Sequence, residues 1–446
     1  MNSLLLVQPS LGRREKVIFP IGLHALYCYL NWKRPDLECA ILDQNAAGDP
    51  DTALKRALAE HRPDLVCISL RNIDSTSRRD LHYHYAHLPP LLETIGRLAP
   101  GADLAIGGAG FSMHAAPIME RNPGLRYGIF LEGEETLLEL LDTGGDPQGV
   151  VGLYYRDDQG RVQFNGPREP MDLSEPPARK LMPLDPAPYG EYGAFGIEYK
   201  RGCALDCDYC SYPFLGGRRV RRRPPEVVVQ EMAWFHEQHG ITLFHLTDPI
   251  FNVPRESAET LCRALIEARL PVRWIGWFNE HLLDQSLVDM ALEAGCAEFV
   301  FSPDGYGEPA LRALKKNVRP EDVRNSFRLA RRNPAMRVSY NFVANPPGER
   351  ARDLVGVLLF YLRARLLLGR RLVAFFINHI RLEPDTGLYR RALEEGVVAP
   401  EQDLLPERVE DLESLFYSNP ATRWGRSVHD LAEWAKGLLR TLIGRR

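Results

Sequence analysis

The sequence predicts an α/β protein with two domains: a doubly wound, Rossmann-like (flavodoxin-like) parallel sheet, followed by a partial (β/α)6 TIM-type barrel. Two observations predict this architecture. Short apolar segments alternate with amphipathic ones along most of the 446 residues, as βα units require, and one proline-rich stretch interrupts the alternation. We therefore expect a first domain over residues 1–150, a linker over 151–193, a barrel over 194–400 and a short helical extension over 401–446.

The first domain contains short strand candidates rich in Val, Ile and Leu, each followed by Gly, Asp or Asn. These strands are Leu4–Gln8, Cys39–Leu42, Leu65–Leu70, Leu104–Ile106 and Tyr127–Phe130. Amphipathic segments at Leu23–Trp32, Asp51–Glu60 and Pro89–Leu98 fit between them as helices. Continuous apolar strands are typical of a parallel sheet that is buried on both faces.

The linker is dense in proline and acidic residues from Gly166 to Gly193 and has no period. Six strand candidates follow it and alternate with helices: Gly196–Lys200, Leu243–Leu246, Val272–Phe278, Phe299–Phe301, Val338–Val343 and Val373–Ile380. Six such units predict a partial barrel with its site at the carboxyl ends of the strands. The tail Trp434–Arg446 is basic and amphipathic, which fits a solvated terminal helix or a segment on a partner or membrane surface.

Composition narrows the class of protein. Hydrophobic content of 45% and charged content of 26% are ordinary for a soluble enzyme, and a net charge of −4 argues against a nucleic-acid binder. No apolar run reaches the roughly 18 residues that span a bilayer. The N-terminal MNSLLLVQPS lacks a basic segment, so it predicts a buried strand rather than a signal peptide. We expect a cytoplasmic protein.

Three of the eight cysteines are clustered. RGCALDCDYCSYP places Cys203, Cys207 and Cys210 in a Cys-x3-Cys-x2-Cys loop directly after the first barrel strand. Thiolates are the preferred ligands of iron–sulfur clusters, and three of them leave the fourth iron open to chelate a small molecule. Structural zinc is the alternative, but it normally requires four protein ligands in paired spacing. The other five cysteines sit singly, as small buried residues do.

This loop, with Tyr209 before its last cysteine, resembles the signature of the radical S-adenosylmethionine (SAM) enzymes. The resemblance implies a 4Fe–4S cluster on the three cysteines and SAM as cofactor. It extends from Phe195 to about Gly396 and includes LFHLTDPIFN, NPPGE and IRLEPDTGLYRRALEEG. Its implied cofactor contacts are Tyr209, Asp248, Asn252 and Ser302, although FSPDGYG departs from the family's usual turn after the fourth strand. A turn cap is the alternative for Asp248. Arg381 either contacts the carboxylate of the substrate or cofactor or forms a surface ion pair.

The first domain resembles the cobalamin-binding domains that precede some radical SAM barrels. Four segments carry this resemblance: LDQNAAG, SLRNID, IGGAGFS and LEGEET. They supply the candidate cofactor residues Asn45, Ser69, Arg71, Asn72, Gly107, Gly108, Gly110, Phe111, Glu132 and Gly133. Another nucleotide binder is the alternative, because Gly-Gly after a strand is a weak signal.

One departure bears on the metal. Asn45 stands where the family's cobalt-ligating histidine would be, so we expect cobalamin without a protein histidine ligand. Arg71 either faces the lower side of the cofactor or pairs with Asp74 or Asp43. The histidines His82, His84 and His87 either reach the site or lie on a solvated helix face. The basic run Gly216–Glu226 predicts a solvated loop that opens a helix at Pro224, and closure over an anionic substrate or cofactor phosphate is the alternative.

The combined resemblance implies a cobalamin-dependent radical SAM enzyme, most often a methyltransferase that acts on an unactivated carbon of a small-molecule or peptide substrate. SLRNID is similar to the tryptophan 2-C-methyltransferase subgroup. The alternatives are radical chemistry without methylation, such as ring contraction or cyclisation, and a cobalamin or redox sensor without catalysis. An electron donor such as flavodoxin or ferredoxin is the expected partner, and nucleic acid is not.

Overall fold

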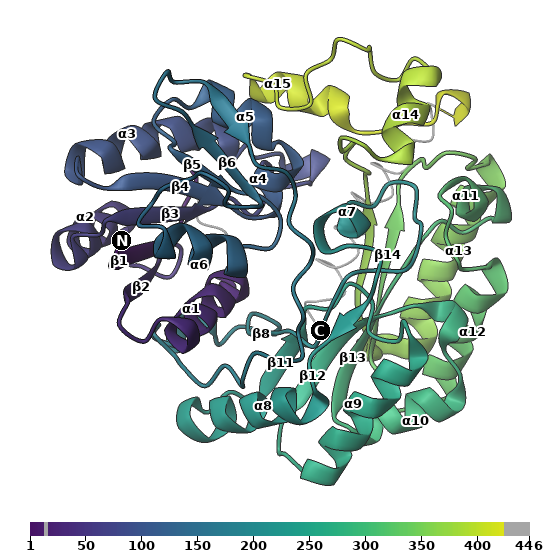
Figure 1. The fold of residues 1–446 in the computed structure, drawn as a ribbon. Coiled ribbons are helices and arrows are strands. Elements are labelled where there is room, and N and C mark those ends of the chain that lie inside the picture. Colours follow the sequence, from purple (N-terminus) through teal and green to yellow (C-terminus); the bar gives the residue numbers. More distant parts are fainter. Residues whose placement is uncertain (13–16, 423–446) are drawn as a thin grey trace.

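A computed structural model describes residues 1–12 and 17–422. Two α/β domains lie side by side, and the C-terminal helices α14 (Gly387–Glu394) and α15 (Val409–Leu412) lie across one end of both (Figure 1). The predicted fold class is confirmed. The amphipathic tail Trp434–Arg446 lies outside the described residues.

The first domain is built on a seven-stranded sheet with the order β2-β1-β3-β4-β5-β6-β7. Its strands are β1 (Ser3–Gln8), β2 (Glu38–Asp43), β3 (Leu65–Ser69), β4 (Asp103–Gly107), β5 (Tyr127–Ile129), β6 (Leu153–Arg156) and β7 (Val162–Phe164). Strands β1 to β5 are parallel in the flavodoxin-like order 2-1-3-4-5. The hairpin β6–β7 adds antiparallel strands beyond the predicted boundary at residue 150.

Helices cover both faces of this sheet because its strands are apolar on both sides. Leucines of α1 (Ile21–Lys33) and α6 (Glu134–Asp142) pack on one face. The other face is covered by α2 (Pro50–His61), α3 (Leu88–Leu98), α4 (Ala109–Met113) and α5 (Ala115–Arg121). The three helices predicted from periodicity, α1, α2 and α3, are confirmed.

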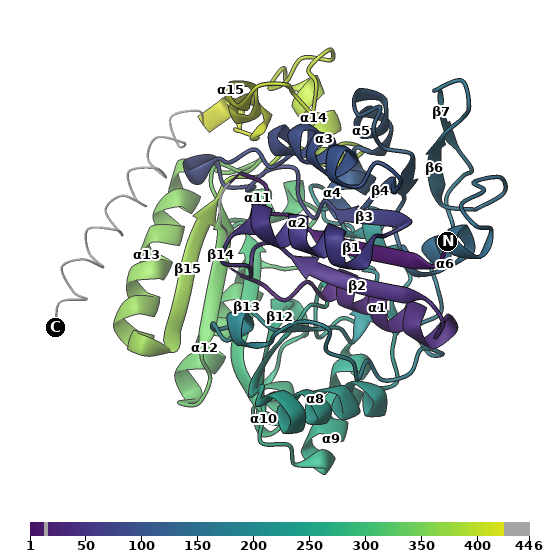
Figure 2. The same cartoon turned by 90° about the vertical axis from the view of Figure 1, so that its left-hand side faces the viewer.

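The second domain is an open barrel of six parallel strands in the order β15-β14-β13-β12-β11-β8. Its strands are β8 (Gly196–Ile197), β11 (Leu243–Leu246), β12 (Arg273–Phe278), β13 (Cys296–Asp304), β14 (Val338–Val343) and β15 (Leu372–Asn378). Five helices cover its outer face: α8 (Pro225–His239), α9 (Arg255–Ala268), α10 (Gln285–Glu293), α12 (Pro320–Arg332) and α13 (Ala351–Leu368) (Figure 2). Short helices α7 (Tyr212–Gly216) and α11 (Glu308–Ala313) follow the first and fourth strands.

The two domains share packed side chains. One apolar core joins Leu88 and Ile118 of the first domain to Ile380 and Leu388 near the end of the barrel. Tyr189 of the linker donates a hydrogen bond to Asp43 at the end of β2, at 2.9 Å. None of the helices within the described residues is long and apolar enough to cross a membrane.

Candidate functional site

The three clustered cysteines lie on the loop between β9 (Lys200–Arg201) and β10 (Arg221–Arg222), directly after β8. These short strands pair in antiparallel fashion and close the base of the loop. Gly202 has φ +85°, and a Cβ there would lie 2.3 Å from the Arg219 carbonyl oxygen, so the base requires glycine. The amide of Cys203 donates to the Gly217 carbonyl at 3.0 Å. The loop therefore holds its thiols at the mouth of the barrel.

The donor set fits a cluster rather than a single ion. Among the described residues, no three His, Cys, Asp or Glu side chains are arranged to hold one metal ion. Ligands of a cubane need not converge on one point, because each thiolate binds a different iron. Burial raises the pKa of Cys207 and brings that of Cys210 to about 12, and a metal cation facing these thiols would favour their thiolate forms.

Asp248 follows β11 and is almost fully buried. Its Oδ1 accepts hydrogen bonds from the amides of Tyr199 and Lys200, both at 2.9 Å. Its Oδ2 is buried and has no hydrogen-bond partner in the described part of the chain. Burial raises the pKa of Asp248 to about 6. An unpartnered buried carboxylate oxygen is suited to accept hydrogen bonds from a cationic ligand.

Asn252 has a different role from the one expected. The amide of Asn279 donates to its Oδ1 at 2.7 Å, and its Nδ2 donates to the Asn279 carbonyl at 2.9 Å. Both ends of the side chain are therefore occupied in joining the loops after β11 and β12. Nearby, the ammonium of Lys200 donates to the carbonyls of Ile250, Phe251 and Val253 at 2.7–3.0 Å. These contacts fix the loop that carries Asp248.

Tyr209 points from the cysteine loop to the end of the fourth barrel strand. Its hydroxyl donates to the carboxylate of Asp304, and Lys316 Nζ lies 2.7 Å from the same Asp304 oxygen. Asp304 has φ +61° and ends β13. Ser302 lies on the same strand and is partly buried. The departure from the family turn thus produces a buried Tyr–Asp–Lys contact that anchors the cysteine loop.

Glu280, which follows β12, is a buried acidic residue outside the motifs of the sequence. This side chain is 2% exposed, and its Oε1 has no hydrogen-bond partner among the described residues. Burial raises the pKa of Glu280 to about 8, although the nearby ammonium of Lys316 acts in the opposite direction. The signal available in the sequence was an acidic residue between two apolar pairs, Trp277–Phe278 and Leu282–Leu283.

Two adjoining cavities of about 460 Å³ and 330 Å³ lie between the domains. Both are lined by Ser69 and Gly108 of the first domain and by Tyr212 and Thr247 of the barrel. Strands β3 and β4 end at this cavity, and so does β11 across from them. Ligands of doubly wound sheets and of barrels bind beyond the carboxyl ends of the strands, and here the two ends face each other.

Eight of the ten residues predicted in the first domain line these cavities. They are Asn45, Ser69, Arg71, Asn72, Gly107, Gly108, Glu132 and Gly133. Gly108 has φ +100°, and a Cβ there would lie 2.6 Å from the Leu70 carbonyl oxygen. This conformation leaves bare backbone on the cavity wall, where a bulky ligand can approach closely.

The remaining two predicted residues support the wall from behind. Phe111 is fully buried in the core between the domains. Gly110 packs against the loop after β3, and a Cβ there would lie 2.9 Å from the Asn72 carbonyl carbon. Neither residue lines the two cavities.

Glu132 is held by arginines from the cysteine loop. It forms a close ion pair with Arg221, and its Oε2 lies 3.5 Å from Arg201 Nη1. Arg223 pairs with Glu231, and both side chains are buried. The expectation of a solvated loop over Gly216–Glu226 was therefore wrong at these arginines, because acidic residues of the first domain and of α8 draw them inward.

The structure separates the alternatives for Arg71 and the histidines. Asp74 pairs with Arg381 at 3.0 Å rather than with Arg71, and Arg71 lines the larger cavity. His84 is 7% exposed and lines the same cavity, whereas His87 is exposed. The alternative of a solvated helix face is therefore wrong for His84; the segment that follows it forms a short 3-10 turn, Tyr85–His87.

Comparison with known proteins agrees with this geometry. Residues 197–360 match the model of the radical SAM superfamily. The chain contains a radical SAM domain. The chain is 24% identical to the cytidylyl-2-hydroxyethylphosphonate methyltransferase of Streptomyces wedmorensis, over 97% of this chain and 92% of that one. It is 25% identical to an anaerobic magnesium-protoporphyrin IX monomethyl ester cyclase of Synechocystis sp., over 78% and 70%.

The solved structure of the radical SAM methyltransferase TsrM from Kitasatospora setae, with tryptophan and a SAM analogue bound, has a similar fold. Its TM-score is 0.81 at 24% identity, over 97% of this chain and 88% of that one. The shared fold therefore includes the first domain as well as the radical SAM domain. The matched residues 197–360 contain the cysteine loop, Asp248 and Ser302.

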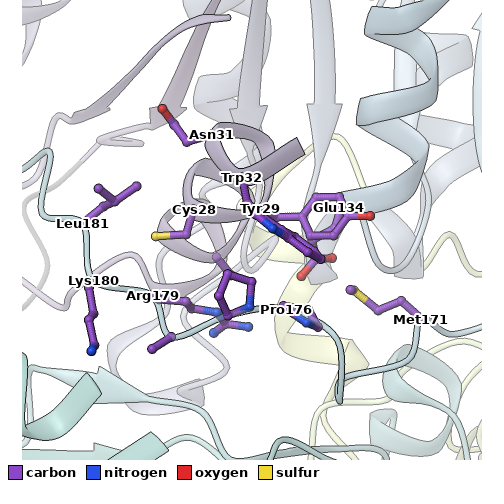
Figure 3. Close-up of a pocket in the computed structure, with 13 residues that line it drawn as sticks. Cys28, Tyr29, Asn31, Trp32, Glu134, Met171, Pro176, Arg179, Lys180 and Leu181 are labelled. Carbon is purple, nitrogen blue, oxygen red and sulfur yellow. The ribbon is translucent and has the colours of Figure 1, made fainter. Parts of the chain in front are cut away.

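A further pocket of about 170 Å³ lies between the first domain and the linker (Figure 3). Cys28 on α1 faces the linker there, and His24 Nε2 lies 3.4 Å from its sulfur. The same Nε2 lies 2.7 Å from the Leu181 carbonyl, to which it donates, so it cannot accept the thiol proton. Burial raises the pKa of Cys28 to about 12. This pair anchors the linker and does not activate the thiol.

Proposed function

We propose that the chain is a cobalamin-dependent radical SAM methyltransferase that transfers a methyl group from SAM to an unactivated carbon of a small-molecule or peptide substrate. One observation carries the proposal: the strand ends of the two domains face each other across the two adjoining cavities, both of which are lined by Tyr212, two residues after Cys210. A cofactor on the first domain and one on the radical SAM domain would therefore meet in the same space.

The chain's own residues would divide the work as follows. Cys203, Cys207 and Cys210 would hold the cluster, and Asp248 Oδ2 would accept a hydrogen bond from the SAM ammonium. Gly107 and Gly108 would let the corrin ring or its tail approach the backbone. When bound, the cluster supplies an open iron and one electron for SAM, and cobalamin supplies a carrier for the methyl group.

Arg71 and Asn45 would set the environment of the cobalt. Both line the larger cavity, and neither side chain is an imidazole. A guanidinium does not ligate metals, because it stays protonated and has no free lone pair. Asn45 and Arg71 would therefore hold the bound cobalamin without offering the cobalt an imidazole, and the charge of Arg71 would discourage other bases from approaching it.

Compartment and partner form part of the proposal. All eight cysteines are free thiols in the structure, which is typical of a reducing compartment such as the cytoplasm. The cluster requires an external electron, for which a flavodoxin or ferredoxin is the proposed donor. Cys207 and Cys210 line a surface hollow of about 260 Å³, on the side of the loop where such a donor would reach the cluster.

Radical chemistry without methylation is the second candidate, because one relative is named a cyclase. Product analysis separates the two. We expect anaerobically reconstituted protein, given SAM, a reductant and cobalamin, to form S-adenosylhomocysteine, measured by mass spectrometry. Formation of 5′-deoxyadenosine without S-adenosylhomocysteine would favour the second candidate. Binding of both cofactors without turnover of SAM would indicate a sensor.

A further inference from the structure

Helix α13 carries an apolar stripe on its outer side. Val355, Leu359, Leu362 and Leu366 are 54%, 47%, 53% and 81% exposed. Their spacing of three or four residues places them on one face of the helix. The opposite face is also apolar and packs against the barrel through residues such as Val357, Phe360 and Ala364. A surface helix is normally polar on its outer face. In α13 both faces are apolar, and only the inner one packs against the barrel.

The stripe lies beside the edge of the barrel sheet, which ends at β15. Helix α13 and β15 lie together at the outer margin of the domain (Figure 2). Nothing within residues 1–12 and 17–422 covers this face, as the exposed fractions show. A contiguous exposed apolar patch of this kind marks a contact surface.

The described chain ends beside the first turn of α13. The side chain of Asn419 donates to the Pro346 carbonyl at 3.2 Å, and Thr422 Oγ1 lies 2.7 Å from the side-chain amide of Asn345. The segment that contains Asn345 and Pro346 leads directly to Arg350, the N-cap of α13. Residues 423–446 therefore start at one end of the stripe.

The sequence of these last residues matches the stripe in period and length. Val428, Leu431, Ala435, Leu438 and Leu442 recur at intervals of three and four, a pattern typical of an amphipathic helix. The stretch from Val428 to Ile443 contains nearly as many residues as α13.

We propose that the C-terminal segment 423–446 covers the outer apolar face of α13 in the same molecule, and runs in the same direction as that helix. Attachment at Thr422 favours this occupant, because a tethered segment has a far higher effective concentration than a free partner. The occupant would bury the leucines of α13 against its own. The basic residues of the segment, among them Lys436 and Arg440, would remain on the solvent side.

Hydrogen–deuterium exchange tests this proposal on the complete chain and on a chain that ends at Thr422. We expect peptides covering Val355–Leu367 to exchange on the order of tenfold more slowly in the complete chain, because the covered helix opens less often. Leu438→Glu in the complete chain should abolish this protection, whereas the matched change Lys436→Glu on the polar face should not. Leu362→Asp should in turn speed exchange in peptides of residues 428–443.

Three results would overturn the proposal. Equal exchange of α13 in both chains would show that the segment does not cover it. Protection that disappears on dilution would assign the face to a second copy of the chain. Protection that appears only with phosphatidylserine-containing vesicles would assign the segment to a membrane surface.

Discussion

The guanidinium of Arg381 and the carboxylate of Asp74 form an ion pair that joins the two domains in the interior of the molecule. Arg381 Nε lies 3.0 Å from Asp74 Oδ2, and the side chains are 3% and 0% exposed. The amide of Thr76 donates to the other Asp74 oxygen at 2.7 Å, and Arg381 Nη2 donates to the Leu404 carbonyl at 2.9 Å. Because Asp74 belongs to the loop after β3, this pair helps to set the width of the cavity beside it.

Removal of one partner of the Asp74–Arg381 ion pair should destabilise the folded chain. Arg381→Ala leaves the Asp74 carboxylate buried without its counter-charge, so we expect it to lower the free energy of unfolding by about 3–5 kcal/mol. Urea denaturation followed by circular dichroism measures the change. The matched control is Arg408→Ala, which breaks an exposed ion pair with Asp411 and should leave the midpoint unchanged. Equal midpoints for the two variants would contradict a locking role for Arg381.

The cysteine loop makes a prediction about iron content. After anaerobic reconstitution we expect about four irons in the wild-type chain and a loss of most of them in Cys207→Ala, because one iron of the cubane loses its thiolate. Iron analysis and the visible absorption spectrum measure this. Cys39→Ala, on β2 of the first domain, is the control and should retain the iron. Tightly bound zinc without iron in the wild type would contradict the assignment.

Glu280 predicts a pH dependence of stability. Its pKa is about 8 in the folded chain, against an ordinary value of 4.5. Between these values the folded state holds a proton that the unfolded state has released. The contribution of the protonated Glu280 carboxyl to the free energy of unfolding is complete below pH 4.5. It falls by about 1.4 kcal/mol per pH unit above that value and is lost as the pH passes 8.

Glu280→Gln cannot ionise, so its stability relative to the wild type should rise as the pH goes from 5 to 8. Urea midpoints of the two chains at both pH values measure this difference. Glu256→Gln, an exposed change on α9, is the control and should show no such trend. A constant difference between wild type and Glu280→Gln across the range would show that Glu280 is not held protonated.

The residues that line the larger cavity allow a prediction about the spectrum of the proposed cofactor, cobalamin. In chain loaded with cob(II)alamin, we expect an electron paramagnetic resonance spectrum without nitrogen splitting from a protein ligand. Asn45→His should introduce that splitting, because imidazole is a good ligand for such metals, and Asn45→Ala should not. Nitrogen splitting in the wild type that disappears in His84→Ala would instead assign His84, which lines the same cavity, as the ligand.

Local patterns were enough to predict the strands, the cysteine loop and the residues that follow strand ends. Parallel sheets align their carboxyl ends, so Ser69 and Gly107 could be placed together from the order of elements alone. Contacts between residues that are distant in the sequence have no local sequence pattern from which they could be predicted. The sequence does not reveal that Glu132 meets Arg221, that Asn252 joins two loops, or that Arg381 reaches Asp74. Each of these depends on how the domains dock, which periodicity within one element does not encode.

The ion pairs along the cavity edge set a rule for building chimeras. Glu132 and Glu134 of the first domain pair with Arg221 and Arg201 beside the cysteine loop. A first domain taken from a relative would carry side chains that match that relative's own cysteine loop. Arg201 and Arg221 of this chain would then lack matching acidic partners. Exchange of modules between such proteins should therefore succeed only when the β9–β10 loop is transferred together with the first domain.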